Sequence, residues 1–442
     1  MTTSAQEPTR SPNSSNQPRT PRLNPNLLAH AEAVLRDVLR FEFAADAVVS
    51  RYFRQNKALG HADRGFIAET VFAVLRRKRS LEVRAAADGK PATTRRLLLA
   101  SLVCVRGMNQ RELASVLKQT EEPWLAAVKA VKPEELPPAV RYDLPDWLYE
   151  RLAAQYGESE MPALAQGLNQ SAPLDLRINP QKVDREAALA ALAADGIAAS
   201  AGTLSPLAIR LGGKPALSKY PLFIDGSLEV QDEGSQLLGY LLAPRRGEMV
   251  VDFCAGAGGK TLLLGALMRN TGRLYAFDIS EKRLANLKPR LARSGLSNVH
   301  PVRIDSERDT KVKRLAGKAD RVLVDAPCSG LGTLKRNPDL KWRQSETSVA
   351  ELSEKQSSIL AAAATLVKQG GQLVYATCSL LAEENDAIVD AFLNTHPQFK
   401  LVSAESALAR QGITLAGERL RLLPHQHATD GFFAVLMERQ GA

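Results

Sequence analysis

The second half of the chain alternates between short apolar runs and longer amphipathic runs, and this alternation limits the possible folds strongly. Runs typical of strands cover 248–254, 273–279, 299–304, 320–326, 371–377 and 432–438. Runs typical of helices lie between most of them, at 259–269, 281–294, 349–368 and 383–394. Strands that alternate with helices favour an α/β, Rossmann-like fold with a doubly wound, mostly parallel sheet. The last apolar run is predicted to add an antiparallel strand.

The rest of the chain is predicted to form a tail and two smaller domains. The whole chain has 442 residues, which exceeds the usual size of one compact domain, so two or three domains are expected. Residues 1–22 contain four prolines and no large aliphatic side chain, which is typical of a disordered tail. Residues 23–145 have helical periodicity, whereas 146–243 mix strand-like runs with an Ala-rich helical run near 184–194. These patterns predict an all-α domain and a small α+β subdomain, before the sheet domain at 244–442.

The composition favours a globular protein that binds a polyanion. The net charge is +10, which favours nucleic acid as a partner. No apolar run approaches the ~20 residues that span a bilayer, and the tail lacks the apolar segment of a signal peptide, so we expect a cytoplasmic protein without a membrane partner. The basic run 76–79, predicted to continue the helix before it, is open to two interpretations. It is either a solvated helix end that complements the helix dipole or a contact with phosphates.

The four cysteines do not form a C-x-x-C pair. A zinc or iron–sulfur site is therefore not expected, and we predict no metal. A disulfide is not expected in the cytosol either. Cys104 ends the apolar helical run 97–104 and is predicted to be a buried core residue.

A glycine-rich turn follows the first strand of the sheet domain. Strand 248–254 is joined to a helix by Gly256-Ala257-Gly258-Gly259. Glycines let the backbone approach a ligand closely, and the first turn of the helix offers free N–H groups to the same ligand. Asp278 ends the next strand and can accept hydrogen bonds from a ribose, and Asp305, after the third strand, could meet an adenine. A simple turn aspartate is the commoner role for either residue alone. Together, after such a turn, they predict a nucleoside-containing cofactor.

Three cofactors compete for this turn. The dinucleotide pattern G-x-G-x-x-G fails because Thr261 occupies its third glycine position. The phosphate loop G-x-x-x-x-G-K-[ST] matches at Gly259-Lys260-Thr261 but has Cys254 in place of its first glycine, so an ATPase stays an alternative. S-adenosylmethionine fits better, because two cysteines further along the chain have no use in phosphoryl transfer.

Those two cysteines, Cys328 and Cys378, each follow an apolar strand directly. A lone cysteine is more often a small buried hydrophobe, but Pro, Ser, Thr and Gly flank these two at the ligand edge of the sheet. Such a pair suits methylation of cytosine C5, in which a thiolate adds to C6 of a base that has left its stack, and a base later removes the C5 proton. Asp325 could protonate N3 and hold the exocyclic amine. The residues alone leave open which thiol attacks.

Several motifs together resemble the RsmB/Sun (Nop-type) family of RNA cytosine-5 methyltransferases. They lie at 252–261, 325–333, 336–339, 375–379, 383–385 and 423–433. The resemblance covers about 170–440 and implies S-adenosylmethionine as methyl donor, Cys378 as nucleophile and Cys328 as the thiol that assists product release. It also implies a cofactor pocket of Cys254, Ala255, Gly256, Ala257, Gly258, Gly259, Lys260, Asp278, Asp305 and Asp325. Ala257 stands where the family usually has Pro, which should loosen the loop without removing a contact.

A fainter resemblance concerns the N-terminal helices. Residues 63–67 and 74–76 are similar to the NusB-like RNA-binding domain of the bacterial RsmB branch, which implies 16S rRNA as substrate, free or in early small-subunit particles. A monomer is expected for so large a substrate. His425 and His427 have no carboxylate or Cys at ligand spacing and are interpreted as loop residues near the site that touch RNA. An RNA-binding assembly factor without activity is the alternative to an enzyme, although the intact thiols argue against it.

Overall fold

A computed structural model describes residues 23–441, and the predicted tail lies outside them. The chain divides into two compact units, with the division between Glu135 and Leu136. The predicted domain boundaries at 145 and 243 stay predictions. Within the described residues, no helix combines the length and apolar character needed to cross a bilayer.

The first unit is helical throughout its described part. α1 begins after Asn24, whose side chain accepts a hydrogen bond from the Leu27 backbone N–H at 2.9 Å, and Pro25 occupies the first helical position. The likeness to NusB stays a prediction. The α-helices are α1 (Pro25–Val38), α2 (Ala45–Gln55), α3 (His61–Arg76), α4 (Lys78–Ala85), α5 (Thr94–Cys104), α6 (Gln110–Leu113) and α7 (Glu122–Ala130).

Two predictions about this unit are wrong. The basic run 76–79 does not continue one helix, because α3 ends at Arg76 and α4 begins at Lys78. Burial, together with the neighbouring Arg77, lowers the pKa of Arg76 to about 10, so this side chain does not belong to a fully solvated helix end. Cys104 is exposed although Val103 beside it is buried. One helical residue turns the side chain by about 100°, which carries the last position of α5 off the apolar face.

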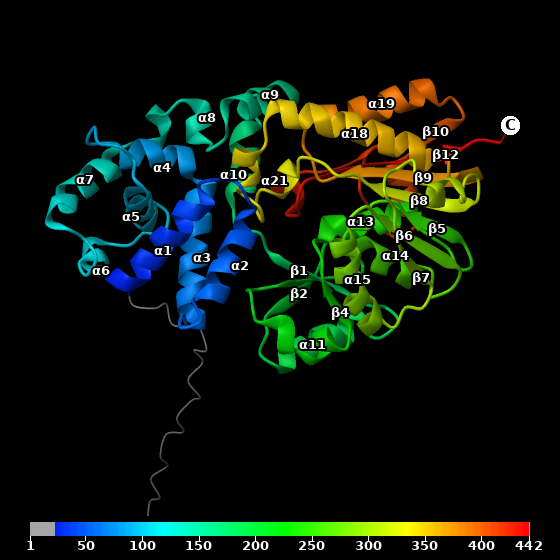
Figure 1. Cartoon of the computed structure of the whole chain (residues 1–442), viewed down its shortest axis with the longest axis horizontal. Coiled ribbons are helices and arrows are strands. Elements are labelled where there is room, and N and C mark those ends of the chain that lie inside the picture. The colour runs from blue at the N-terminus through cyan, green and yellow to red at the C-terminus, as the bar shows by residue number, and fades with distance from the viewer. Residues whose placement is uncertain (1–22, 442) are drawn as a thin grey trace, which may run out of the picture. The chain divides into compact units, whose positions relative to one another are not determined.

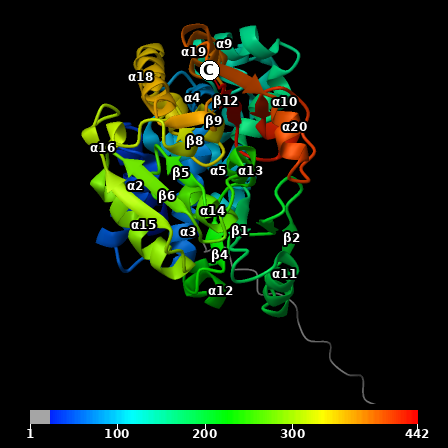
Figure 2. The same cartoon turned by 90° about the vertical axis from the view of Figure 1, so that its right-hand side faces the viewer.

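The second unit begins with three helices and a small antiparallel sheet of strand order β2-β3-β1-β4. The Ala-rich helix predicted near 184–194 is α11, and Figure 2 shows it beside β2, with β1 and β4 nearby. The elements are α8 (Pro138–Arg141), α9 (Asp146–Tyr156), α10 (Met161–Asn169), β1 (Leu174–Ile178), α11 (Arg185–Ala194), β2 (Ala199–Ala201), β3 (Ala208–Leu211), α12 (Pro221–Ile224) and β4 (Leu228–Val230).

The large sheet has the predicted doubly wound, mostly parallel form. Its strand order is β10-β12-β9-β8-β5-β6-β7; the five strands from β5 to β9 run parallel, and β12 pairs antiparallel with β9, as predicted. The short strands β10 and β11, both paired with β12, were not predicted. The strands are β5 (Met249–Asp252), β6 (Arg273–Asp278), β7 (Val299–Arg303), β8 (Ala319–Asp325), β9 (Val367–Thr377), β10 (Phe399–Val402), β11 (Leu420–Leu422) and β12 (Phe432–Arg439).

Two predicted helices have different ends. The helix predicted at 349–368 is α18 (Glu346–Ala364), and β9 already begins at Val367. The sequence pattern did not reveal the start of β9, because the residues up to Gly370 are mostly polar. Gly370 has φ +71°, a backbone conformation that suits glycine. The helix predicted at 383–394 is a 3₁₀ turn, η5 (Ala382–Glu384), followed by α19 (Asp386–Thr395).

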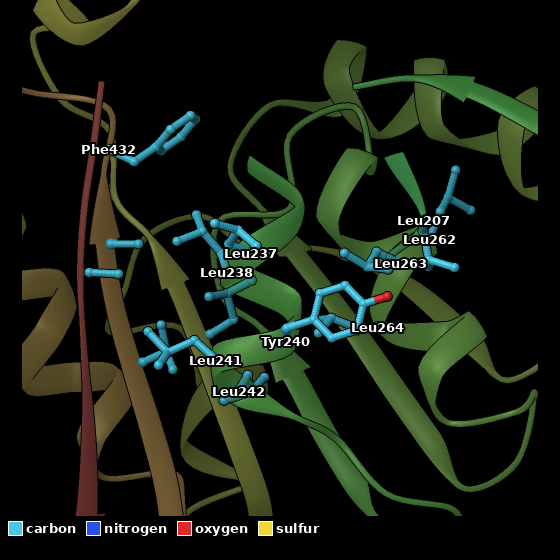
Figure 3. Close-up of a cluster of buried hydrophobic side chains, with 14 of the residues drawn as sticks. Leu207, Leu237, Leu238, Tyr240, Leu241, Leu242, Leu262, Leu263, Leu264 and Phe432 are labelled. Atoms are coloured by element: carbon cyan, nitrogen blue, oxygen red, sulfur yellow. The ribbon is translucent and has the colours of Figure 1, made fainter. Parts of the chain in front are cut away.

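Helices cover both faces of the large sheet (Figure 1). Both faces of the sheet are apolar and need a cover, as β9 shows. Val374 and Ala376 point to one face and belong to one buried cluster. Leu373 and Tyr375 point to the other face and belong to a second cluster. α13 (Glu233–Leu242), α14 (Gly259–Leu267) and α15 (Glu281–Ser294) complete the first cluster, and α18 and α19 complete the second. Figure 3 shows the leucines of α13 and α14 in the first cluster.

The order of the strands creates a crevice at one edge of the sheet. The chain runs outward from β5 through β6 to β7 and then returns to β8, on the other side of β5. At such a reversal the loops after the two neighbouring strands turn to opposite sides, and ligands of this fold class bind between them. The carboxyl ends of β5 and β8 therefore mark the place for a binding site.

Candidate functional site

A cavity of about 890 Å³ lies at these carboxyl ends. It is lined by nine of the ten predicted cofactor residues and by both predicted catalytic thiols, Cys328 and Cys378. The exception is Gly258, which faces α15: with φ +84°, a Cβ added to it would lie 2.1 Å from Leu287 Cδ1. Among the described residues, no group of three or more His, Cys, Asp or Glu side chains could hold a metal ion.

The glycine-rich loop is held by hydrogen bonds to its backbone. The Gly256 N–H donates to Asp278 Oδ2 at 2.8 Å, and Asp278 Oδ1 accepts from the Ser280 N–H at 2.7 Å. On the other side of the loop, Arg290 donates to the Ala257 carbonyl at 2.6 Å. Asp278 thus has a structural task as well as a place in the cavity wall.

The second predicted aspartate has a different setting. Asp305 lies at the rim of the cavity, where its side chain is 78% exposed and pairs with Arg303 at 3.3 Å. In contrast, the Asp278 side chain is only 4% exposed. A carboxylate at the rim shares any ligand contact with water, so its contribution to binding should be smaller.

An ion pair crosses the crevice between β5 and β8. Lys260, in the first turn of α14, donates to Asp325 Oδ2 at 2.6 Å, and Asp325 ends β8. Burial opposes the charge on Lys260, but the Asp325 carboxylate outweighs it, so the pKa of Lys260 is raised. Lys260 therefore keeps its positive charge at neutral pH.

A second acidic group, Asp252, lies at the base of the loop. It is 1% exposed, its Oδ2 accepts a hydrogen bond from the Thr261 hydroxyl at 2.6 Å, and its Oδ1 is buried without a partner. Burial raises the pKa of Asp252 to about 7, although the bond from Thr261 opposes the shift. A buried carboxyl of this kind holds a proton in the folded state over much of the acidic range.

We expect Asp252 to make stability depend on pH. Its folded pKa lies above its ordinary value, so its stabilising contribution is complete below about pH 4 and is lost as pH rises to about 7. Between pH 5 and pH 8 the protein should lose roughly 3 kcal/mol of unfolding free energy relative to Asp252→Asn. Urea unfolding of both proteins at the two pH values measures this difference. Equal losses in the two proteins would contradict the assignment.

The two predicted catalytic thiols meet in the cavity. β8 and β9 are adjacent and parallel, with Asp325 opposite Ala376, and the Sγ atoms of Cys328 and Cys378 lie 3.3 Å apart. The ends of β8 and β9 are therefore neighbours. The hydrogen bond with Cys378, and then burial, raise the pKa of Cys328 well above its ordinary value, so Cys328 keeps its proton.

The third cysteine of the cavity is Cys254, on the loop after β5. Burial and the nearby Asp252 carboxyl raise its pKa well above the ordinary value. A thiol that stays neutral is a poor nucleophile, since only the thiolate attacks. Cys254 is therefore suited to packing against a ligand and not to covalent chemistry.

Comparison with known proteins identifies the family of this site. A family model described as 16S rRNA methyltransferase RsmB/F matches residues 239–438, and one described as the ferredoxin-like domain of RsmF/B-like methyltransferases matches 144–217. A probable ribosomal RNA small subunit methyltransferase B of Synechocystis is 33% identical over 92% of this chain and 98% of its own length. The chain belongs to the RsmB/F family of rRNA methyltransferases. A probable methyltransferase B of Bacillus subtilis is 36% identical over 67% of this chain and 66% of its own length.

Solved structures agree with this membership of the RsmB/F family. The crystal structure of PH0851 covers 95% of this chain and 100% of its own, with a TM-score of 0.76 and 26% identity. A methyltransferase homologue from Pyrococcus horikoshii covers 70% of this chain and 100% of its own, with a TM-score of 0.60 and 28% identity. The predicted methyltransferase fold is thereby confirmed.

Sequence reasoning missed some side chains that support this RsmB/F-family site. Arg177 of β1 is 3% exposed and donates to the Gly259 carbonyl at 2.7 Å, so the small sheet holds the end of the glycine-rich loop. Glu229 of β4 binds Arg290 at 2.9 Å, which orients the guanidinium on the Ala257 carbonyl. An arginine inside the apolar strand run of β1 was the available signal, because a buried charge needs a partner.

The two histidines do not have the predicted setting. His425 and His427 lie in the short helix α21 (Pro424–His427), not in a loop, and neither lines the cavity. The His425 ring contacts Glu160 at 2.5 Å, and His427 Nδ1 accepts from the Leu423 N–H at 3.0 Å. Their interpretation as loop residues is wrong, because Pro424 begins a helical turn that the sequence pattern did not reveal.

Proposed function

We propose that this RsmB/F-family chain methylates C5 of a cytosine in 16S rRNA, with S-adenosylmethionine as donor. The observation that carries the proposal is the 3.3 Å separation of the Cys328 and Cys378 sulfurs in the wall of one cavity. A methyltransferase that acts on oxygen or nitrogen needs no such pair, whereas addition to C6 of a pyrimidine needs a thiolate. The net charge of +10 supports RNA as the partner.

The cavity suits S-adenosylmethionine in shape and in chemistry. A volume of about 890 Å³ can accommodate the donor together with a flipped base. Asp278 offers carboxylate oxygens to the ribose hydroxyls, Asp305 lies at the rim for the adenine, and the loop from Cys254 to Lys260 can support the amino-acid part. When bound, S-adenosylmethionine supplies an electrophilic methyl group.

The chain's own residues account for the remaining steps. The Cys378 thiolate adds to C6 of the cytosine, and the Asp325 carboxyl, in its protonated form, gives its proton to N3, so the negative charge does not remain on the ring. Lys260 occupies Oδ2 of Asp325, and among the described residues nothing binds its Oδ1, which can contact N3 and the exocyclic amine. After C5 has gained the methyl group, a solvent base takes the C5 proton, the C5–H electrons form the C5=C6 bond, and the S–C6 electrons leave with the Cys378 sulfur; Cys328 assists this release.

The remaining parts of the proposal concern RNA binding, the oligomeric state and the location of the protein. We propose that the helical unit, with its NusB-like resemblance, helps to bind 16S rRNA, that the protein acts as a monomer in the cytoplasm, and that neither a metal nor a membrane takes part. The alternatives are an ATPase and an assembly factor that binds RNA without activity. Family membership favours methyl transfer over both.

Transfer of tritium from labelled S-adenosylmethionine tests the proposal. The RNA substrates are 16S rRNA alone and in the small ribosomal subunit, and nucleoside analysis follows. Label in 5-methylcytosine is the expected result. Bound donor without label in any RNA would overturn the proposal in favour of the assembly factor, and RNA-stimulated ATP hydrolysis would favour the ATPase.

A further inference from the structure

One buried carboxylate connects the loops that carry the two thiols. Glu384, the last residue of η5, is 0% exposed and does not line the cavity. Its Oε1 accepts from the Ser329 N–H at 2.7 Å, and its Oε2 accepts from the Ser329 hydroxyl at 2.5 Å and from the Ser379 hydroxyl. Ser329 follows Cys328 and Ser379 follows Cys378. The same carboxylate thus holds the residue next to each thiol.

Further contacts fix Glu384 itself. Gln356 of α18 donates to Glu384 Oε1 at 2.9 Å and to the Pro327 carbonyl at 3.0 Å, just before Cys328. The Tyr375 hydroxyl donates to the Glu384 carbonyl at 2.7 Å. β9 and α18 therefore determine where the Glu384 carboxylate lies. The carboxylate in turn holds the loops after β8 and β9 in place.

The chemistry of this position requires an acceptor. No described Lys or Arg pairs with Glu384, so four donors from neutral groups satisfy its two oxygens. A buried carboxylate without such donors would be strongly destabilised. A glutamine would replace one acceptor by an NH₂ group, which can only donate. At the Oε1 position this group would face two donors, the Ser329 N–H and the Gln356 NH₂, and at the Oε2 position both Ser hydroxyls would have to turn their hydrogens away.

We propose that Glu384 is a positioning residue that sets the spacing of the Cys328 and Cys378 sulfurs. It touches neither the proposed base nor the proposed donor. It acts by binding Ser329 and Ser379 through one carboxylate, so that the loops after β8 and β9 move as one body. The mechanistic value of this spacing rests on the proposed function, but the spacing itself can be measured independently.

Oxidation by diamide measures the spacing of the sulfurs without any catalysis. The reagent takes two electrons and two protons from two thiols, which form a disulfide, and peptide mapping follows the peptide that links Cys328 to Cys378. Glu384→Gln in the full chain should slow this disulfide at least about ten-fold. The matched control is Glu383→Gln, because Glu383 is the neighbouring, partly exposed residue and binds Arg151 outside this network. The control should react like the wild type.

Turnover on RNA provides the second readout. Glu384→Gln should lower kcat about 30-fold and leave KM for donor and RNA within about two-fold, because neither ligand touches the residue. If Glu384→Gln does not fold, the double variant Ser329→Ala with Ser379→Ala, which removes both hydroxyl donors, takes its place. Unchanged disulfide formation in the folded variant would overturn the proposal. An inactive wild type with the expected disulfide rates would overturn only the proposed function.

Discussion

Cys328→Ala should trap the protein covalently on its RNA. In the proposed mechanism, attack by Cys378 on C6 does not require the second thiol, whereas release of the product does, so the adduct should accumulate. Turnover should fall at least about 1,000-fold. Denaturing gel electrophoresis of protein mixed with labelled RNA and S-adenosylmethionine measures the adduct as a slowly migrating, protease-sensitive band.

Two further variants make this result decisive. Cys378→Ala should give neither adduct nor product, since it lacks the nucleophile. Cys104→Ala, at the exposed end of α5 in the helical unit, should behave like the wild type. An adduct with Cys378→Ala, or identical behaviour of the two cavity variants, would show that the roles of the thiols are wrongly assigned.

Asp278→Asn should weaken binding of S-adenosylmethionine about 100-fold, which corresponds to about 2.7 kcal/mol. The wild-type carboxylate accepts bonds from the Gly256 and Ser280 N–H groups and, as proposed, from the ribose. An amide has one oxygen in place of two, so either the Gly256 or the Ser280 N–H loses its acceptor, and one acceptor fewer remains for the ribose. Isothermal titration calorimetry with the donor measures the change.

Asp305→Asn is the matched comparison for this variant. Asp305 is also predicted to contact the donor, but its exposed carboxylate already competes with water and with Arg303. We expect binding to weaken no more than about three-fold. A larger loss with Asp305→Asn than with Asp278→Asn would reverse the proposed importance of the two aspartates.

The sequence predicts the strands of the large sheet well where apolar residues dominate. β5 and β8 are buried on both faces and therefore appear as continuous apolar runs. β10 and β11 were missed because edge positions tolerate polar residues in short strands, and this leaves no periodic signal.

The sequence predicts which types of residue line the candidate site, but not which side chains contact one another there. Strand ends with Gly, Asp and Cys indicated the cavity, because ligands gather at that edge of a parallel sheet. The contacts of Lys260 with Asp325 and of Glu384 with both cysteine loops depend on which strands are neighbours, and a single sequence does not contain that order. Cys104 was misjudged for a related reason, since its exposure depends on where α5 ends.

The reversal of strand order at β5 has a consequence for how the site is divided along the chain. Asp278 and Asp305 follow strands on one side of β5, whereas Cys328 and Cys378 follow strands on the other. Under the proposed function, donor binding and base chemistry therefore depend on separate stretches of the chain. Under the proposed function, the loops after β8 and β9 form the base side of the cavity, and the Lys260–Asp325 ion pair joins this side to the donor side.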